Sequence, residues 1–437
     1  MANHPKKPNV NLNLNVRGLP QSATLAINEL SNQLKQEGRK VYKLGLGQSP
    51  FPVPESVVDE LKVNARQKDY LPVKGLMRLR KAVADYHCRV NGTCHSPEDV
   101  LIGPGSKELM FLLQYVYYGD LLIPTPSWVS YAPQAQMIGR QVRWLKTRAE
   151  NNWILTAEEL EARCINDPAK PRILIINYPS NPTGLTYTPG ELKELAHVSK
   201  KYQVILLSDE IYGELHHKGK HVSIARYYPE GTIISGGLSK WCGAGGWRLG
   251  TFTFPASMRW LLDSMAVMAS ETFTSTSAPI QYAAVRAFSG GHDIEKYLWR
   301  CRWILSKLAE VISNKLIAAG ISVQFPQGAF YLFPDFSPLR EKLVEKGVTG
   351  SQSLSRVLLE ETGVAILPGE VFGRPPEELT ARIAYVDFDG VRAHSAAENL
   401  NSQGEIDENF IYNYCGNTIE AIDKICGWIS NLNIKNE

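Results

Sequence analysis

The feature that most constrains the fold is an alternation of short apolar runs with segments of helical spacing through the middle of the chain. The runs are rich in leucine and β-branched residues and cover residues 121–124, 172–177, 204–208, 232–235 and 249–254. This alternation predicts an α/β fold with a mostly parallel sheet and helices on both faces. Ligands of such sheets bind beyond the carboxyl ends of the strands. The polar residues that follow these runs are therefore the first candidates for a site.

The two ends of the chain predict a second, smaller α+β domain. Helical spacing covers residues 23–38, where a glycine ends the pattern, and returns at 294–318 and 418–432. Short strand-like pieces lie at 329–333 and 381–386. A long helix with a few short strands is typical of a compact unit that packs beside a larger sheet.

We therefore expect three parts along the chain. Residues 1–45 form an N-terminal arm and a helix that joins the small domain, residues 46–290 form the large domain, and residues 291–437 form the small domain. The alternation at 9–16 favours a short strand, an arm that reaches onto a partner subunit, or a frayed terminus. The segment 389–407 has the composition of an inserted surface loop.

Composition and charge exclude several classes of function. The 437 residues are 44% hydrophobic and 21% charged, and the net charge of +3 is too small to favour a nucleic-acid partner. No apolar stretch approaches the roughly 18 residues that a membrane span needs, and the N-terminus is polar, so membrane insertion and secretion are disfavoured. The seven cysteines are odd in number and lack a CxxC spacing, so we expect neither a disulfide framework nor a metal site. These features predict small-molecule partners and a cytoplasmic location.

One glycine-rich stretch, from Gly237 to Gly250, holds a lysine and, eight residues later, an arginine. A lysine becomes a nucleophile toward carbonyl groups when burial or a nearby positive charge destabilises its ammonium form. An arginine grips a phosphate through two parallel hydrogen bonds. Pyridoxal phosphate carries both an aldehyde and a phosphate. Lys240 and Arg248 together therefore predict a site for this cofactor.

A second glycine-rich segment leads into an apolar helical run. Gly105, Ser106 and Lys107 lie at its start, where backbone N–H groups and the positive end of a helix suit an anion such as a phosphate. Taken alone, a plain loop-to-helix junction is the commoner explanation of such a segment. The phosphate that Arg248 requires favours the anion site.

Four further side chains follow predicted strands or turns and match other parts of the same cofactor. Asp209 suits a protonated pyridine nitrogen, while the Tyr212 hydroxyl and the Asn181 amide suit the ring oxygen. Trp128 suits a stack on the ring. Alone, the acid is more often a helix cap and the tryptophan a core residue. Together these residues favour one cofactor.

With these residues the chain resembles the class I and II pyridoxal-phosphate aminotransferases of the aspartate aminotransferase fold, from about residue 44 to residue 428. The stretch from Gly237 to Gly250 matches the family's lysine signature at every specified position. The resemblance implies the fold type I architecture, in which a large domain with a mostly parallel seven-stranded sheet flanked by helices joins a smaller α+β domain. It also implies ping-pong transfer of an amino group between an α-amino acid and a 2-oxo acid, in a homodimer whose active sites are shared.

The resemblance gives each site residue a role. Lys240 is the lysine that binds the cofactor aldehyde and moves the proton, with Asp209 and Tyr212 as the other catalytic residues. The cofactor is held by Gly105, Ser106, Lys107, Trp128, Asn181, Asp209, Tyr212, Ser239, Lys240 and Arg248, and by Tyr70 of the partner subunit. The substrate is held by Gly47, Lys107, Trp128, Asn181 and Arg382, of which Arg382 clamps the α-carboxylate.

Some positions depart from the family pattern or bear on the substrate. Gly237 stands where many relatives carry a phosphate-binding serine, so Ser235 or Ser239 is expected to complete the phosphate shell. Gln48 stands where several relatives have glutamate. Lys107 matches a lysine that pairs with the distal carboxylate in prokaryotic-type aspartate enzymes, which favours a dicarboxylic substrate over the alternative of a solvated lysine.

The leading hypothesis is an aminotransferase for aspartate and 2-oxoglutarate, with aromatic or other amino acids as the runner-up. A β-lyase of the same fold is a second enzymatic alternative. A transcriptional regulator is disfavoured, because fewer than about 45 residues precede the family match and they lack a basic cluster.

Overall fold

The computed structural model describes residues 11–17, 23–398, 400 and 406–432. Its centre is a seven-stranded sheet in the order β2-β8-β7-β6-β5-β3-β4. All strands run parallel except β8, which is antiparallel to both β2 and β7. The strands are β2 (Val100–Gly103), β3 (Asp120–Thr125), β4 (Val142–Lys146), β5 (Arg172–Asn177), β6 (Ile205–Asp209), β7 (Thr232–Gly237) and β8 (Gly250–Thr253).

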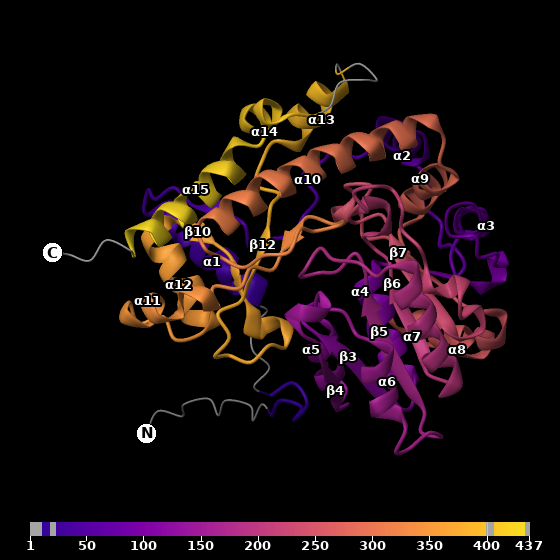
Figure 1. The fold of residues 1–437 in the computed structure, drawn as a ribbon. Helices are drawn as coiled ribbons and strands as arrows, with labels where there is room; N and C mark the ends of the chain where they lie inside the picture. Colours follow the sequence, from indigo (N-terminus) through magenta and orange to yellow (C-terminus); the bar gives the residue numbers. More distant parts are fainter. Residues whose placement is uncertain (1–10, 18–22, 399, 401–405, 433–437) are drawn as a thin grey trace, which may run out of the picture.

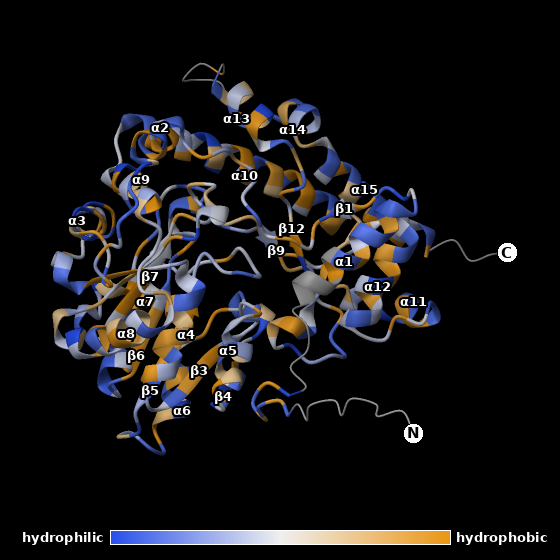
Figure 2. Ribbon diagram, turned by 180° about the vertical axis from the view of Figure 1, so that it is seen from behind, coloured by the Kyte–Doolittle hydropathy of each residue, from blue (hydrophilic) through white to orange (hydrophobic). Residues whose placement is uncertain are grey.

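Helices cover both faces of this sheet. Successive residues of a strand point to opposite faces, so each strand contributes side chains to two cores. Ile173 and Ile175 of β5 join a core with residues of α4 (Ser106–Val116), α5 (Tyr131–Met137) and α8 (Arg259–Thr272). Leu174 and Ile176 join a separate core with α6 (Ala157–Cys164) and α7 (Pro189–Lys201). Figure 2 shows the hydrophobic colour along β3 and β5, as expected for strands that are buried on both faces.

A smaller group of elements lies to one side of the large sheet (Figure 1). Its strands pair as a three-stranded sheet, β11-β12-β9, and as a two-stranded sheet, β1-β10. The 27-residue helix α10 (His292–Ala318) runs from the helices beside the large sheet to those of this group (Figure 1). The strands are β1 (Tyr42–Lys43), β9 (Tyr331–Leu332), β10 (Val364–Ala365), β11 (Leu367–Pro368) and β12 (Ala381–Ala384). The other helices are α1 (Ala23–Gln36), α2 (Glu55–Asn64), α3 (Met77–Tyr86), α9 (Ala278–Ser289), α11 (Arg340–Glu345), α12 (Ser351–Thr362), α13 (Gly390–Glu398), α14 (Glu408–Tyr414) and α15 (Gly416–Asn431).

The sequence-based elements are confirmed at the five apolar runs, which form β3 and β5 to β8, and at the helices α1, α10 and α15. Gly38 adopts φ +83° after α1, which is the left-handed conformation expected of a glycine that ends a helix. The pieces at 329–333 and 381–386 contain β9 and β12.

Three expectations differ from the structure. Residues 11–17 contain a turn in which Val16 and Arg17 donate to the Asn13 carbonyl, so a strand there is wrong; residues 9 and 10 lie outside the described part. The expected surface loop at 389–407 contains α13, whose His394 and Ala397 are buried. A disulfide joins Cys88 and Cys94, whereas the sequence analysis expected no disulfide framework.

Two further properties concern function classes. Within the described residues no helix combines the length and apolar composition of a membrane span. The same residues contain no group of three or more histidine, cysteine or acidic side chains arranged to hold a metal ion.

Candidate active site

The predicted site residues gather where strands of the large sheet end. Asp209 is the last residue of β6 and is paired in register with Asn177, the last residue of β5. Lys240 follows β7, which lies beside β6 in the sheet. The carboxyl ends of adjacent parallel strands meet at one edge, so the fold brings these side chains together.

Lys240 lies in a partly buried position that weakens its ammonium form. Its Nζ donates a hydrogen bond to the Gly47 carbonyl at 2.8 Å and lies 5.6 Å from the centre of the Tyr212 ring. Burial, followed by the positive charge of Arg382, lowers the pKa of Lys240 to about 8. A lysine with a pKa near 8 has a substantial neutral fraction at physiological pH. Lys240 is therefore suited to attack a carbonyl carbon.

Asp209 is a buried carboxylate that could accept a positively charged partner. Burial raises its pKa to about 6, and the hydroxyl of Tyr131, which donates to Oδ2 at 2.6 Å, opposes that rise. The Ser235 hydroxyl lies 3.4 Å from Oδ1. No side-chain cation pairs with this carboxylate among the described residues. A ring N–H⁺ of a bound cofactor would satisfy it.

Tyr131 lies in the candidate site, although the sequence analysis did not single it out. It lies in the first turn of α5, and its side chain is 1% exposed. Its only sequence signal was its position shortly after the end of β3, where other site residues also follow strands.

Asn177 connects the two sides of the site through its amide group. Its Nδ2 donates to the Asp209 carbonyl at 2.8 Å, and its Oδ1 accepts the backbone N–H of Asn181 at 2.7 Å. Asn181 Oδ1 in turn accepts a hydrogen bond from Arg382 Nη1 at 3.0 Å. These contacts fix the Asn181 amide relative to the end of β6.

Arg382 lies on β12, across the site from the large sheet. Its Nη2 donates to the Gly45 carbonyl at 2.6 Å, and its guanidinium carbon lies 4.8 Å from the Tyr331 ring centre and 5.1 Å from that of Phe372. The side chain is 3% exposed, yet its Nε has no hydrogen-bond partner in the described residues. An unpartnered donor on a buried cation fits a site that receives a carboxylate.

A close backbone approach forms a cradle at the N-terminus of α4. A Cβ on Gly105, which has φ +95°, would lie 2.1 Å from Arg248 Nη2. A Cβ on Gly250 would lie 2.1 Å from the backbone nitrogen of Ser106. At Gly105 the positive φ favours glycine, and at Gly250 the contact with the backbone leaves no room for a side chain. The free N–H groups at the start of the helix and the arginine thus face the same region, as a phosphate requires.

Lys107 lies at the edge of this cradle. Its Nζ is 5.0 Å from the ring centre of Trp128, and partial burial together with Arg248 lowers its pKa. Trp128 meets Tyr131 edge to face, with ring centres 5.2 Å apart. Arg248 itself donates only to backbone carbonyls, those of Gly245 and Pro104.

Four cations of the site therefore lack a carboxylate partner within the described residues: Lys107, Lys240, Arg248 and Arg382. Asp209 is the carboxylate that acts most strongly on Lys240. An excess of positive charge held in a partly buried site fits ligands that carry a phosphate and carboxylates. The residues present thus fit pyridoxal phosphate and an amino acid.

One predicted residue stands apart from this group. Tyr70 is 88% exposed, and within the described residues it makes no hydrogen bond or ion pair with the residues around Lys240. Ser235 lies beside Asp209, whereas Ser239 directly precedes Lys240 and is half-buried.

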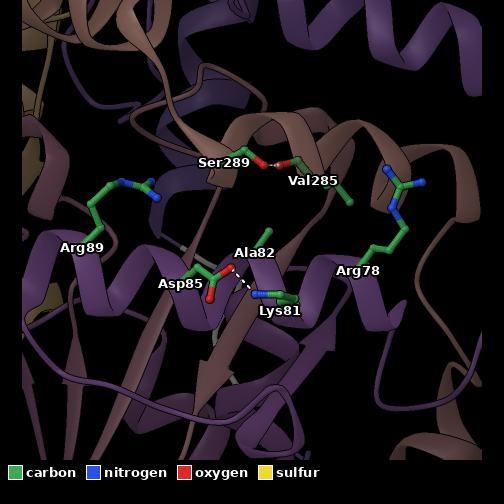
Figure 3. Close-up of a pocket in the computed structure, with 7 residues that line it drawn as sticks. All are labelled: Arg78, Lys81, Ala82, Asp85, Arg89, Val285 and Ser289. Carbon is green, nitrogen blue, oxygen red and sulfur yellow. Dashed lines mark hydrogen bonds and ion pairs between the residues drawn. The ribbon is translucent and has the colours of Figure 1, made fainter.

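A surface cavity of about 320 Å³ lies elsewhere, between α3 and α9 (Figure 3). Its charged lining residues include Lys81 and Asp85, which pair with each other at 2.7 Å. None of its lining residues belongs to the predicted site, so the strand-end cluster is the candidate active site.

Comparisons with known proteins agree with this geometry. The family model for aminotransferase class I and II matches residues 39–391. The chain is 34% identical over 380 residues to the aspartate aminotransferase of Bacillus sp. (strain YM-2), which covers 85% of this chain and 93% of that protein. It is 31% identical to the asparagine–oxo-acid transaminase of Streptococcus mutans, over 83% of this chain and 92% of that protein.

The fold also matches solved structures. The Thermus thermophilus aspartate aminotransferase with maleate aligns with a TM-score of 0.81 at 26% identity, over 96% of this chain and 99% of that one. The aromatic aminotransferase from Pyrococcus horikoshii OT3 aligns with a TM-score of 0.75 at 27% identity, over 92% and 99% of the two chains. The chain belongs to the class I and II aminotransferases and is a pyridoxal-phosphate-dependent enzyme of fold type I.

Proposed function

We propose that this aminotransferase exchanges the amino group between aspartate and 2-oxoglutarate. The observation that carries this proposal is the number of unpaired cations around Lys240. Arg248 is assigned to the cofactor phosphate and Arg382 to the α-carboxylate that every amino acid carries. Lys107 then remains as a third cation, and a second carboxylate on the substrate would satisfy it.

Each of the site residues has a distinct role in this reaction. Lys240 would hold the cofactor, and its amine would remove the Cα proton of the amino acid and return a proton in the next step. Asp209 would keep the ring nitrogen protonated, and Tyr212 and Asn181 would donate to the ring oxygen. The cofactor, when bound, supplies an electron sink for the substrate carbon. Amino transfer runs in two halves, in which the amino acid leaves as a 2-oxo acid and a second 2-oxo acid takes up the amino group.

The remaining residues bind and orient. Trp128 would stack on the ring, and Gly105, Ser106 and Lys107 would hold the phosphate through backbone N–H groups. Of the two candidate serines, we assign Ser239 to the phosphate, because Ser235 lies against Asp209. Gly47 contributes a backbone contact beside the substrate carboxylate, and its carbonyl already accepts from Lys240.

We further propose a homodimer with a shared site, in the cytoplasm. The 88% exposure of Tyr70 in the single chain supports the dimer, because a tyrosine that binds phosphate needs a site to enter, and the partner subunit provides one. The proposed parts of the chain remain 1–45, 46–290 and 291–437.

The relatives support the dicarboxylate and also define the alternatives. Relatives named aspartate aminotransferase support aspartate, and the asparagine and aromatic enzymes keep other donors as the runner-up. A β-lyase reaction is the other alternative.

The experiment is a comparison of donors with purified, cofactor-loaded enzyme. We expect oxaloacetate from aspartate only when 2-oxoglutarate is present, and slower turnover of phenylalanine and alanine. Pyruvate and ammonia released from cystathionine without an acceptor would instead indicate the lyase. Equal rates with aspartate and alanine would contradict the role of Lys107.

A further inference from the structure

Tyr331 lies at the meeting point of three predicted site residues, although its sequence context indicated only an apolar strand. It is the first residue of β9, its side chain is 1% exposed, and β9 pairs with β12, which carries Arg382. A buried tyrosine hydroxyl needs a hydrogen-bond partner, and here that partner is the hydroxyl of Tyr212 at 2.7 Å.

The ring of Tyr331 contacts the substrate side of the site. The Arg382 guanidinium carbon lies 4.8 Å from its ring centre, which is a stacking distance for a cation on an aromatic face. Gly47 passes directly against the hydroxyl, since a Cβ at Gly47 would lie 2.0 Å from the Tyr331 oxygen. One side chain thus touches the ring-oxygen donor, the carboxylate clamp and the backbone that accepts from Lys240.

The hydrogen bond between the two phenols can run in either direction. Burial raises the pKa of Tyr331 and raises that of Tyr212 well above its usual value, so both phenols keep their protons at neutral pH. Each hydroxyl has one proton to donate. If Tyr212 donates its proton to the cofactor ring oxygen, as proposed above, then Tyr331 donates in the bond between the two phenols.

We propose that Tyr331 is a positioning residue with two separable parts: its hydroxyl donates to Tyr212 and directs the Tyr212 proton to the cofactor ring oxygen, while its ring holds Arg382 in place for the substrate carboxylate. The first part rests on the proposed role of Tyr212, and the second rests on that of Arg382. Tyr212 lies in the segment that follows β6 of the large sheet, and Tyr331 lies on β9 of the smaller group, so this contact also joins the two halves of the site.

Two variants separate the parts in the cofactor-loaded enzyme. Tyr331→Phe removes the hydroxyl and keeps the ring, whereas Tyr331→Leu removes both. The first readout is the midpoint of the pH-dependent change in visible absorbance of the cofactor bound to Lys240. The second is the dissociation constant of maleate, an unreactive dicarboxylate, measured from the absorbance change on binding.

For Tyr331→Phe we expect the midpoint to rise by about 0.5–1 pH unit, because a weaker Tyr212 donor stabilises the ring oxygen anion less. Maleate should still bind within about twofold of wild type. For Tyr331→Leu we expect the same rise and about fivefold to tenfold weaker maleate binding, since the stack on Arg382 is lost.

Tyr385→Phe is the matched control. Tyr385 is equally buried, and its hydroxyl contacts His217 and the Ala329 carbonyl rather than Tyr212 or Arg382. We expect this variant to leave both readouts at wild-type values, whatever it does to the melting temperature.

Tyr212→Phe separates failure of this inference from failure of the proposed function. An unchanged midpoint in Tyr331→Phe, with a raised midpoint in Tyr212→Phe, overturns the donor role of Tyr331. An unchanged midpoint in both variants overturns the role of Tyr212 and, with it, the donor role of Tyr331. If maleate binds Tyr331→Leu as tightly as wild type, the proposed role of the Tyr331 ring is wrong. If maleate does not bind the wild-type enzyme, the dicarboxylate assignment is contradicted, while the hydrogen bond from Tyr331 to Tyr212 is still tested by the midpoints.

Discussion

Replacement of Lys107 by methionine tests the substrate assignment directly. Methionine keeps much of the length of the side chain and its contact with Trp128, but it removes the charge. A charge-assisted hydrogen bond contributes about 1.5–3 kcal/mol, and the exposure of Lys107 at the edge of the site places its effect in the lower half of that range. A loss of about 1.5–2 kcal/mol corresponds to a fall of roughly 10- to 30-fold in kcat/KM.

The assay compares donors in one enzyme. We expect the fall in kcat/KM for aspartate and for 2-oxoglutarate, mainly through KM, and less than about a twofold change for alanine, which has no second carboxylate. Lys193→Met, on the exposed face of α7, controls for the loss of one surface charge. Equal losses for aspartate and alanine would show that Lys107 serves the cofactor alone, and no loss for either would show a solvated lysine.

Three further predictions follow from the same geometry. The pKa of Lys240 is lowered from 10.5 to about 8, so the unfolded chain binds this proton more tightly than the folded one. Lys240→Met should therefore raise the free energy of unfolding of the cofactor-free protein in urea by about 2–3 kcal/mol at pH 7, with about half of that gain left at pH 9.5. A gain that grows with pH would contradict this prediction. Gly250→Ala places a Cβ 2.1 Å from the backbone at the start of α4 and should weaken pyridoxal phosphate binding at least about 10-fold, whereas Gly246→Ala, with nothing within 4 Å, should bind normally; similar affinities in a fluorescence titration would refute the cradle. The Cys88–Cys94 disulfide closes a loop with a sequence separation of 6, so Cys88→Ser should lower the free energy of unfolding by about 2 kcal/mol, and reductant should bring wild type to the same value and leave the variant unchanged.

The five strands of the large sheet that the sequence predicted are largely buried, although β2, which is equally buried, was not predicted. β5 and β6 carry unbroken apolar runs, because helices cover the sheet on each side. β4 was missed, since it is an edge strand in which only Leu145 is buried and its remaining residues are polar or partly exposed. The helix α13 was missed because its first turn begins with glycine and its buried residues, two alanines, a glycine and His394, do not form a strongly apolar pattern.

The sequence predicted those site residues whose type and spacing indicate a chemical role. Lys240, Arg248 and Asp209 each follow or precede a strand of the sheet, so the sequence pattern already brought them to one edge. Tyr331 and Tyr131 were not predictable in this way, because a tyrosine in an apolar segment has the same sequence signal whether its hydroxyl meets a core carbonyl or a catalytic group. Only tertiary packing distinguishes Tyr331, which meets Tyr212, from Tyr385, which meets His217. The disulfide was not predictable for a similar reason, since the left-handed residue Gly92 lies between its two cysteines and only the folded backbone shows that they meet.

We propose above that Lys240 holds pyridoxal phosphate in a site suited to dicarboxylic amino acids. The most direct measurement is the visible absorbance spectrum of the purified protein with pyridoxal phosphate, repeated after L-aspartate and then after 2-oxoglutarate. We expect a band that Lys240→Ala abolishes, that aspartate converts to the band of the aminated cofactor, and that 2-oxoglutarate restores. A band that persists in Lys240→Ala would contradict the role of the lysine, and a Lys240-dependent band that aspartate leaves unchanged would contradict the dicarboxylic substrate.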